Sequence, residues 1–105
     1  MGAERHDYAE PAYDLDEIKR TVTSKGRRAF TGSSLAGIAE LGMTTDEAID
    51  CIVNLTHEDF YKTMPALKDP SHFQDVYHGN SWNEVIYIKF TGYSDRPVVI
   101  SFKEK

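Results

Sequence analysis

The sequence predicts an α+β fold in which helices from the N-terminal half pack on one face of an antiparallel β-sheet formed by the C-terminal half. Between Leu15 and Leu55, apolar residues recur every three or four positions, as in amphipathic helices. Residues 84–90 and 97–103 are instead rich in β-branched and aromatic side chains, and the Gly/Ser/Asp cluster between them is typical of a β-hairpin. Helices followed by strands favour α+β over an alternating α/β fold.

The chain begins with a polar, aperiodic stretch, and we expect residues 1–13 to form a flexible arm and residues 14–105 a single domain. Asp14 and Glu17 have the spacing of a capping box, so a first helix is expected from there to about Ser24. Gly26 is suited to cap its C-terminal end. Residues 27–30 are expected to form a short edge strand.

Two further helices follow. The second is expected to begin at Thr31 or Ser33 and to end at Gly42. Thr44 and Glu47 again have the spacing of a capping box, and an apolar stripe after them predicts the third helix. The N-terminal half is therefore expected to be helical throughout.

A short helical turn capped by Thr56 is expected to reach Lys62. The dipeptides Met64-Pro65 and Asp69-Pro70 interrupt the helical pattern, so an irregular loop is expected over residues 62–71. Residues 73–77 are expected to form a strand, which ends in the turn-forming residues 78–81.

The hairpin strands are expected to have one buried and one open face, because successive strand side chains point to opposite sides of a sheet. The apolar set is expected to face the core: Ile86, Ile88, Phe90, Val98, Ile100 and Phe102. The opposite set is polar: Tyr87, Lys89, Ser101 and Lys103. A packed interior would not tolerate this polar set unpaired, so that face is expected to be free for a ligand.

Composition excludes several classes of protein. The 105 residues carry a formal net charge of −5, which argues against a broad nucleic-acid-binding surface, although the C-terminal half is closer to neutral and could carry a local basic patch. The single cysteine, Cys51, excludes an internal disulfide and favours the reducing cytoplasm. No signal peptide or membrane-spanning run is found, so no membrane role is expected.

Four sequence blocks allow a family to be suggested. They are Asp59-Phe60-Tyr61-Lys62, Phe73-Gln74-Asp75-Val76-Tyr77, Val85-Ile86-Tyr87-Ile88-Lys89 and Val99-Ile100-Ser101-Phe102-Lys103-Glu104-Lys105. In order and spacing they resemble the motility quorum-sensing regulator toxins, a branch with a RelE-like fold, over nearly the whole domain. One departure is Phe73, which stands where a tryptophan commonly precedes the Gln-Asp-Val-Tyr run and keeps an aromatic surface.

The resemblance implies the toxin of a type II toxin–antitoxin pair. Such a toxin is an mRNA interferase that cuts single-stranded mRNA without a metal or other cofactor, at short GC-containing triplets such as GCU. It also implies a cognate antitoxin protein of the zinc-binding, helix-turn-helix type, so no direct DNA binding is expected without that partner. The site residues carried over as catalytic are Lys62, Gln74, Tyr87 and Lys103, and those carried over as substrate-binding are Tyr61, Phe73, Tyr77 and Lys89.

These residue types fit the chemistry. Metal-free RNA cleavage uses the ribose 2′-hydroxyl as the nucleophile, so the enzyme must remove its proton, stabilise charge on the phosphorane and protonate the leaving 5′-oxygen. Lys62 and Lys103 can hold the phosphate, Tyr87 can donate a proton, and Gln74 can hydrogen-bond a base edge or a phosphate oxygen. The sequence does not decide which residue acts as the general base.

Each assignment has a structural alternative. Lysines on strands are usually solvated or protect sheet edges, which is the preferred interpretation of Lys89 and Lys105 from the residues alone. A strand tyrosine such as Tyr87 is ordinarily packing. His72 and His78 could form an acid–base pair of the two-histidine ribonuclease type, but exposed turn positions are the first interpretation of both. A metal site near His57 is less expected.

Two functions therefore stand after the sequence analysis. The leading one is an endoribonuclease toxin. The alternative is a non-catalytic α+β module that binds RNA or a protein with the same open sheet face. A DNA-binding regulator is weaker, because no helix is both basic and joined to a partner in helix-turn-helix fashion.

Overall fold

The computed structural model describes residues 10–81, 83–92 and 96–105. The helices are α2 (Leu15–Lys25), α3 (Gly32–Glu40) and α4 (Thr45–Val53), with 3₁₀ turns at Gly26–Ala29 and His57–Asp59. The strands are β1 (Phe60–Pro65), β2 (Phe73–Ser81), β3 (Glu84–Phe90) and β4 (Val99–Glu104). The predicted α+β fold, with helices in the N-terminal half and a sheet in the C-terminal half, is confirmed.

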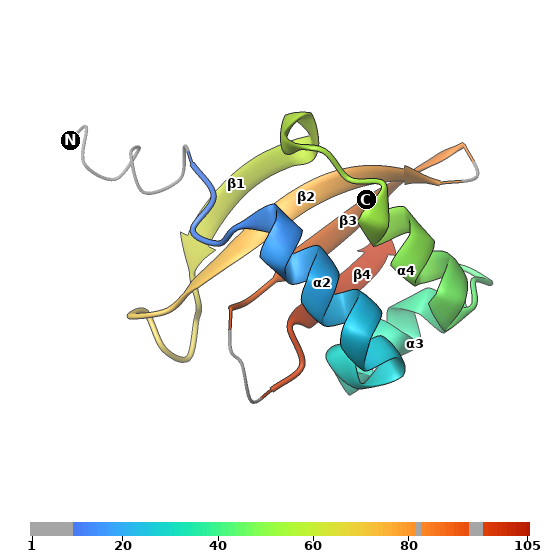
Figure 1. Ribbon diagram of the computed structural model, residues 1–105, viewed down its shortest axis with the longest axis horizontal. Helices are drawn as coiled ribbons and strands as arrows, with labels where there is room; N and C mark the ends of the chain where they lie inside the picture. Colours follow the sequence, from blue (N-terminus) through green and yellow to red (C-terminus); the bar gives the residue numbers. More distant parts are fainter. Residues whose placement is uncertain (1–9, 82, 93–95) are drawn as a thin grey trace.

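The four strands form one antiparallel sheet in the order β1-β2-β3-β4. Figure 1 shows α2 and α4 lying across one face of this sheet, with α3 beside β4. None of the helices in the described part of the chain lies on the opposite face, so they leave that sheet face uncovered (Figure 1).

Local hydrogen bonds set the helix ends largely where the sequence predicts them. The Asp14 carboxylate accepts from the Asp16 N–H and begins α2, without the reciprocal bond of a capping box. Thr31 caps α3, and Thr44 and Glu47 form the predicted capping box of α4. The expected strand over residues 27–30 is wrong, because Gly26–Ala29 form a 3₁₀ turn and Phe30, which follows the turn, makes only an isolated bridge to Val99.

β1 was not predicted. The expected helical turn ends at Asp59. From Phe60 to Pro65 the chain then pairs with β2, although the end of a helix and a loop were expected there. Pro65 is tolerated because β1 is an edge strand and its last residue needs no outward donor. Pairing with β2 outweighs the local turn signals here.

The hairpin register differs from simple alternation in β4. Phe90 pairs with Val99 whereas Lys89 pairs with Ser101, so Ile100 is an extra residue in the ladder. The expected core position of Ile100 is therefore wrong: it is half-buried, and Val99 is buried in its place.

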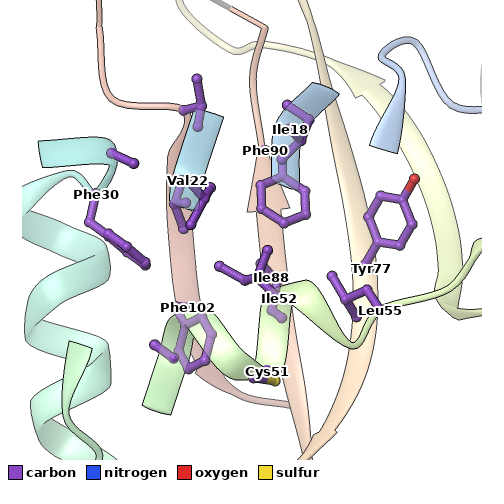
Figure 2. Packing of buried hydrophobic residues seen from close by; sticks show 14 of the residues in the cluster. Ile18, Val22, Phe30, Cys51, Ile52, Leu55, Tyr77, Ile88, Phe90 and Phe102 are labelled. Atoms are coloured by element: carbon purple, nitrogen blue, oxygen red, sulfur yellow. The ribbon is translucent and has the colours of Figure 1, made fainter. Parts of the chain in front are cut away.

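The core lies between the helices and the covered sheet face. Its members come from all three helices and from strands β2, β3 and β4, and Figure 2 shows Phe90, Phe102 and Ile88 meeting Val22 and Ile52. Tyr77 points into the same cluster, and its ring makes edge contacts with Phe60 and Phe90. The burial of these rings explains why the helices stay on this face.

α3 covers the outer edge of β4. The Thr31 hydroxyl donates to the Ile100 carbonyl at 3.1 Å. Gly37 lies so close to β4 that a Cβ on it would be 2.0 Å from the Phe102 carbonyl oxygen. Only a residue without a side chain lets this helix approach the strand so closely.

The segment before α2 is fastened to β2. The N–H groups of Ala12 and Tyr13 donate to the two carboxylate oxygens of Asp75, each at 3.0 Å, and the Tyr13 hydroxyl donates to the Phe73 carbonyl at 2.7 Å. Asp75 is only 1% exposed. Residues 10–13 are thus held in place, whereas the rest of the expected arm, residues 1–9, lies outside the described residues.

Replacing Asp75 by alanine should lower the free energy of unfolding by about 2 kcal/mol, because hydrogen bonds to a charged group are worth roughly 1.5–3 kcal/mol and two N–H donors lose their acceptor. Urea unfolding measures this loss, and limited proteolysis should cut near residues 10–13 sooner. Asp50→Ala removes an exposed carboxylate on α4 and should stay within about 0.5 kcal/mol of the wild type. Equal stability of the two variants would contradict the role given to Asp75.

No helix within the described part of the chain is long and apolar enough to cross a membrane.

Candidate active site on the open sheet face

The uncovered side of the sheet, called the open face below, can be traced from the strand register. Residues paired across antiparallel strands point to the same side, and residues two apart along a strand share that side. One row across the sheet joins His78, Tyr87 and Lys103, and the next joins Lys62, Val76, Lys89 and Ser101. Gln74, paired with Met64, belongs to the row after these. The predicted polar side of the hairpin is confirmed.

Three lysines gather on this face. Lys62 and Lys89 are the cross-strand neighbours of Val76 on either side, and Val76 is 0% exposed although it lies outside the main core cluster. This burial fits a cover made by the aliphatic stems of the two lysines, since long cationic side chains cover apolar surface with their methylene groups.

The lysines also affect one another. Burial lowers the pKa of Lys89, and the charges of Lys103 and Lys62 lower it further. Clustered cations of this kind form a preorganised site for a phosphate group. The open face is therefore locally basic although the whole chain carries a net charge of −5.

Aromatic rings line the row beside the lysines. Tyr61, which is 56% exposed, stacks on His78 with ring centroids 4.3 Å apart, and the rings of His78 and Tyr87 lie 6.1 Å apart. The Lys103 ammonium sits over the Tyr87 ring, 5.3 Å from its centroid, and the Lys62 ammonium lies 5.6 Å from the centroid of Tyr61. The site thus combines cations with stacked rings.

Tyr87 keeps its proton at neutral pH. Burial raises the pKa of its phenol, and the proximity of Tyr61 adds to the effect. A protonated phenol on a face that also carries lysines can donate a hydrogen bond or a proton to an oxyanion, but it is a poor proton acceptor.

Gln74 lies at one end of the open face, where it lines a surface hollow. This hollow has a volume of about 390 Å³, and Gln74 and Lys89 line one side of it. The other lining residues come from two loops: Ala66, Leu67, Lys68, Asp69 and Arg96. A space of this size beside the lysines is large enough for a nucleobase.

Strand carboxylates are absent from this face within the described residues. Asp75 pairs with Phe90, Glu84 with Ser81, and Glu104 with Ile86. All three therefore belong to the opposite side of the sheet. The strands separate the two signs of charge between their faces, and this explains how an acidic chain can present a basic surface.

Two of the residues carried over as substrate-binding, Phe73 and Tyr77, lie on the other side of the sheet. Tyr77 is 1% exposed and points into the core, where burial, Asp75 and Asp14 raise the pKa of its phenol to about 12. Phe73 shares that side of β2 by alternation and belongs to the end of the strand that Tyr13 fastens. The other predicted residues, Tyr61, Lys62, Gln74, Tyr87, Lys89 and Lys103, come together on the open face.

The two histidines are not equivalent. His72 hydrogen-bonds Asp69 through Nδ1 at 2.8 Å, near the start of β2. His78 lies within β2, in the row of Tyr87, and not in the expected turn. Six residues of extended chain separate them by about 20 Å, so they cannot act as an acid–base pair. The period-two pattern running from Gln74 through Val76 would have placed His78 on the open face.

No group of three or more His, Cys, Asp and Glu side chains positioned to hold a metal ion occurs among residues 10–81, 83–92 and 96–105.

Comparison of the sequence with known protein families identifies the family of this chain. The family model described as motility quorum-sensing regulator, toxin of MqsA, matches residues 10–104. The chain belongs to the motility quorum-sensing regulator toxin family. The mRNA interferase toxin MqsR of Escherichia coli (strain K12) is 35% identical to this MqsR-family chain over 95 residues, which make up 90% of this chain and 95% of that relative.

The family resemblance inferred from the four sequence blocks is thus confirmed. Each block supplies one strand of the sheet of this MqsR-family toxin, from Phe60 in β1 to Glu104 in β4. The similarity noticed in the sequence is therefore concentrated in the element that carries the open face.

Proposed function

We propose that this MqsR-family toxin is a metal-independent endoribonuclease that cleaves single-stranded mRNA on its open face. One observation carries the proposal: Lys62, Lys89 and Lys103 share with the protonated phenol of Tyr87 a face to which the strands bring no carboxylate, and the Lys103 ammonium lies over the Tyr87 ring. Such a face attracts a phosphodiester and holds charge where the transition state develops it. The name of the Escherichia coli relative, an mRNA interferase toxin, agrees with this chemistry.

The chemistry needs only the RNA and these side chains. The 2′-hydroxyl loses its proton and attacks the adjacent phosphorus, the P–O5′ bond breaks, and the leaving 5′-oxygen takes a proton. The products are a 2′,3′-cyclic phosphate and a 5′-hydroxyl. Lys62 and Lys103 stabilise the phosphorane oxygens, and Tyr87 protonates the leaving oxygen.

Substrate choice follows from the same surface. A single strand is favoured, because the exposed ring of Tyr61 and the hollow beside Gln74 offer places for unpaired bases to stack and to hydrogen-bond. We place the cleavage at short GC-containing triplets such as GCU, as the family resemblance suggests. In the cytoplasm such cleavage inhibits translation.

A cognate antitoxin is the second partner we propose. The family description, toxin of MqsA, supports a protein that neutralises the toxin. We expect this partner to be zinc-binding and to contain a helix-turn-helix, so that it supplies any DNA binding by the complex.

The test is cleavage of a defined mRNA by the purified protein in EDTA, with mapping of the cut sites. We expect discrete cuts at a short recurring motif, with 2′,3′-cyclic phosphate ends, and no cut where a 2′-deoxynucleotide replaces the residue before the scissile bond. Tight RNA binding by the folded protein without any product would contradict the proposal and favour a non-catalytic binding module.

A further inference from the structure

His78 lies on β2 in the row of Tyr87 and Lys103, and the reaction described above gives it no role. It lies between Tyr61, which stacks on its ring, and Tyr87, its partner across β3. Its Nε2 atom is shielded from solvent and makes no hydrogen bond within the described structure. A shielded ring nitrogen without a partner is costly, and such atoms are often retained where a substrate supplies the missing bond.

The cleavage reaction also lacks a proton acceptor. The described strands bring no carboxylate to the open face, and Tyr87 retains its proton. The lysines are positively charged and suit the phosphate better than the role of proton acceptor. His78 is the one imidazole in the rows that carry Lys62, Tyr87 and Lys103. Imidazole is the side chain whose ordinary titration falls nearest neutral pH.

We propose that His78 is the general base of this toxin, accepting the proton of the ribose 2′-hydroxyl through a ring nitrogen. This inference rests on the proposed endoribonuclease function and adds a residue to it. As the proton moves to His78, the 2′-oxygen bonds to phosphorus, the P–O5′ bond breaks, and Tyr87 gives its proton to the departing 5′-oxygen. His78 then returns its proton to the phenolate of Tyr87 through solvent, so the cycle leaves no net charge on the enzyme.

The surroundings keep His78 ready for this task. Burial lowers the pKa of its ring, and the charge of Lys105 at the end of β4 acts in the same direction. The other titratable groups near it are Tyr61 and Lys62 on β1, Tyr87 on β3 and Lys103, which lies on β4 in the same row. The positive charges of Lys62, Lys103 and Lys105 all disfavour a further cation at His78. The imidazole is therefore neutral near pH 7 and able to accept a proton.

The ring can also reach a substrate. Rotation about χ2 of histidine is soft and roughly two-fold, so either nitrogen can turn toward a bound ribose. Tyr61 covers one side of the ring but is itself 56% exposed, at the irregular step of the edge strand β1. A nucleobase that displaces or extends this stack would bring its ribose beside His78.

The main test compares kcat/KM across pH for the wild type and His78→Gln, with His57→Gln as a matched control on the exposed turn before β1. The wild-type rate should rise with pH through the pKa of His78, below the ordinary value of an imidazole, because only the neutral ring accepts a proton. We expect His78→Gln to lose about 100-fold or more in kcat at neutral pH, to change KM little, and to lose this acidic limb. His57→Gln should keep both rate and profile.

Two further measurements separate catalysis from packing. Imidazole added to His78→Ala should restore part of the cleavage, which a packing role would not predict. In the wild type, the His78 ring resonance in NMR spectra should shift when an RNA carrying a 2′-deoxynucleotide at the cut site binds, and this needs no variant to fold.

The outcomes separate the role of His78 from the proposed endoribonuclease activity on which it rests. Wild-type cleavage together with an unchanged rate and pH profile in His78→Gln, or an unshifted ring resonance on RNA binding, overturns the role of His78 and leaves the endoribonuclease in place. Absence of cleavage by the wild-type protein overturns both.

Discussion

Lys103→Ala should cut kcat/KM for RNA cleavage by about 100-fold or more while leaving the melting temperature nearly unchanged. The ammonium group of Lys103 lies over Tyr87 and near Lys89, so in the proposed reaction it stabilises the negative charge that grows on the phosphorane. Removing one preorganised donor from such a site typically costs about 10²–10³ in rate. Folding should tolerate the change, because the side chain is exposed.

Two variants sharpen this experiment. Arg20→Ala removes the same formal charge from α2, where the guanidinium is paired with Glu17 on the surface, and it should cleave within about twofold of the wild type. Lys103→Arg keeps the charge but changes its shape, so it should recover part of the rate. If Lys103→Ala cleaves as fast as Arg20→Ala, the open face is not the catalytic surface.

Gly37→Ala should lower the free energy of unfolding by about 3 kcal/mol or more, the upper range for forcing an extra group into a packed contact. The added Cβ would lie 2.0 Å from the carbonyl oxygen and 3.1 Å from the carbonyl carbon of Phe102, and a backbone cannot swing away as a flexible side chain can. Either α3 or β4 must shift. Because the Lys103 Cβ is the next nearest atom, at 3.6 Å, cleavage should fall as well.

This prediction opposes helix propensity, which favours alanine over glycine by about 1 kcal/mol inside a helix. Gly32→Ala offers the comparison within the same helix, since nothing lies within 4 Å of its Cβ position. That variant should be as stable as the wild type or slightly more stable. Urea unfolding measures the free energy of unfolding of both variants. Equal values would mean that the packing of α3 on β4 does not require glycine at position 37.

Features encoded over a few neighbouring residues could be predicted from the sequence. The Thr44 and Glu47 capping box satisfies backbone groups three residues apart, so its spacing alone locates the start of α4. The alternation in β3 likewise places Tyr87 and Lys89 opposite Ile86 and Ile88 without knowledge of any partner. These local regularities gave the fold class and most of the candidate site.

Other features depend on partners far along the chain, and for them local signals were misleading. The segment after Asp59 looks helical, yet it becomes β1 because β2 offers it a ladder of hydrogen bonds. Ile100 has the right parity for the core, but the bulge opposite Phe90 moves it out of register. Register is a property of two strands, and no single strand contains it.

By itself, the sequence determined that this chain is an α+β member of a toxin family with a polar, lysine-bearing sheet face. Only the tertiary structure decided which aromatic and imidazole groups share that face: Tyr77 turns inward because the helices cover its side of β2, and His78, one residue on, turns outward to Tyr61 and Tyr87. The physical reason is that alternation along a strand is local, whereas the choice of the face to be buried is made by the elements that pack against it.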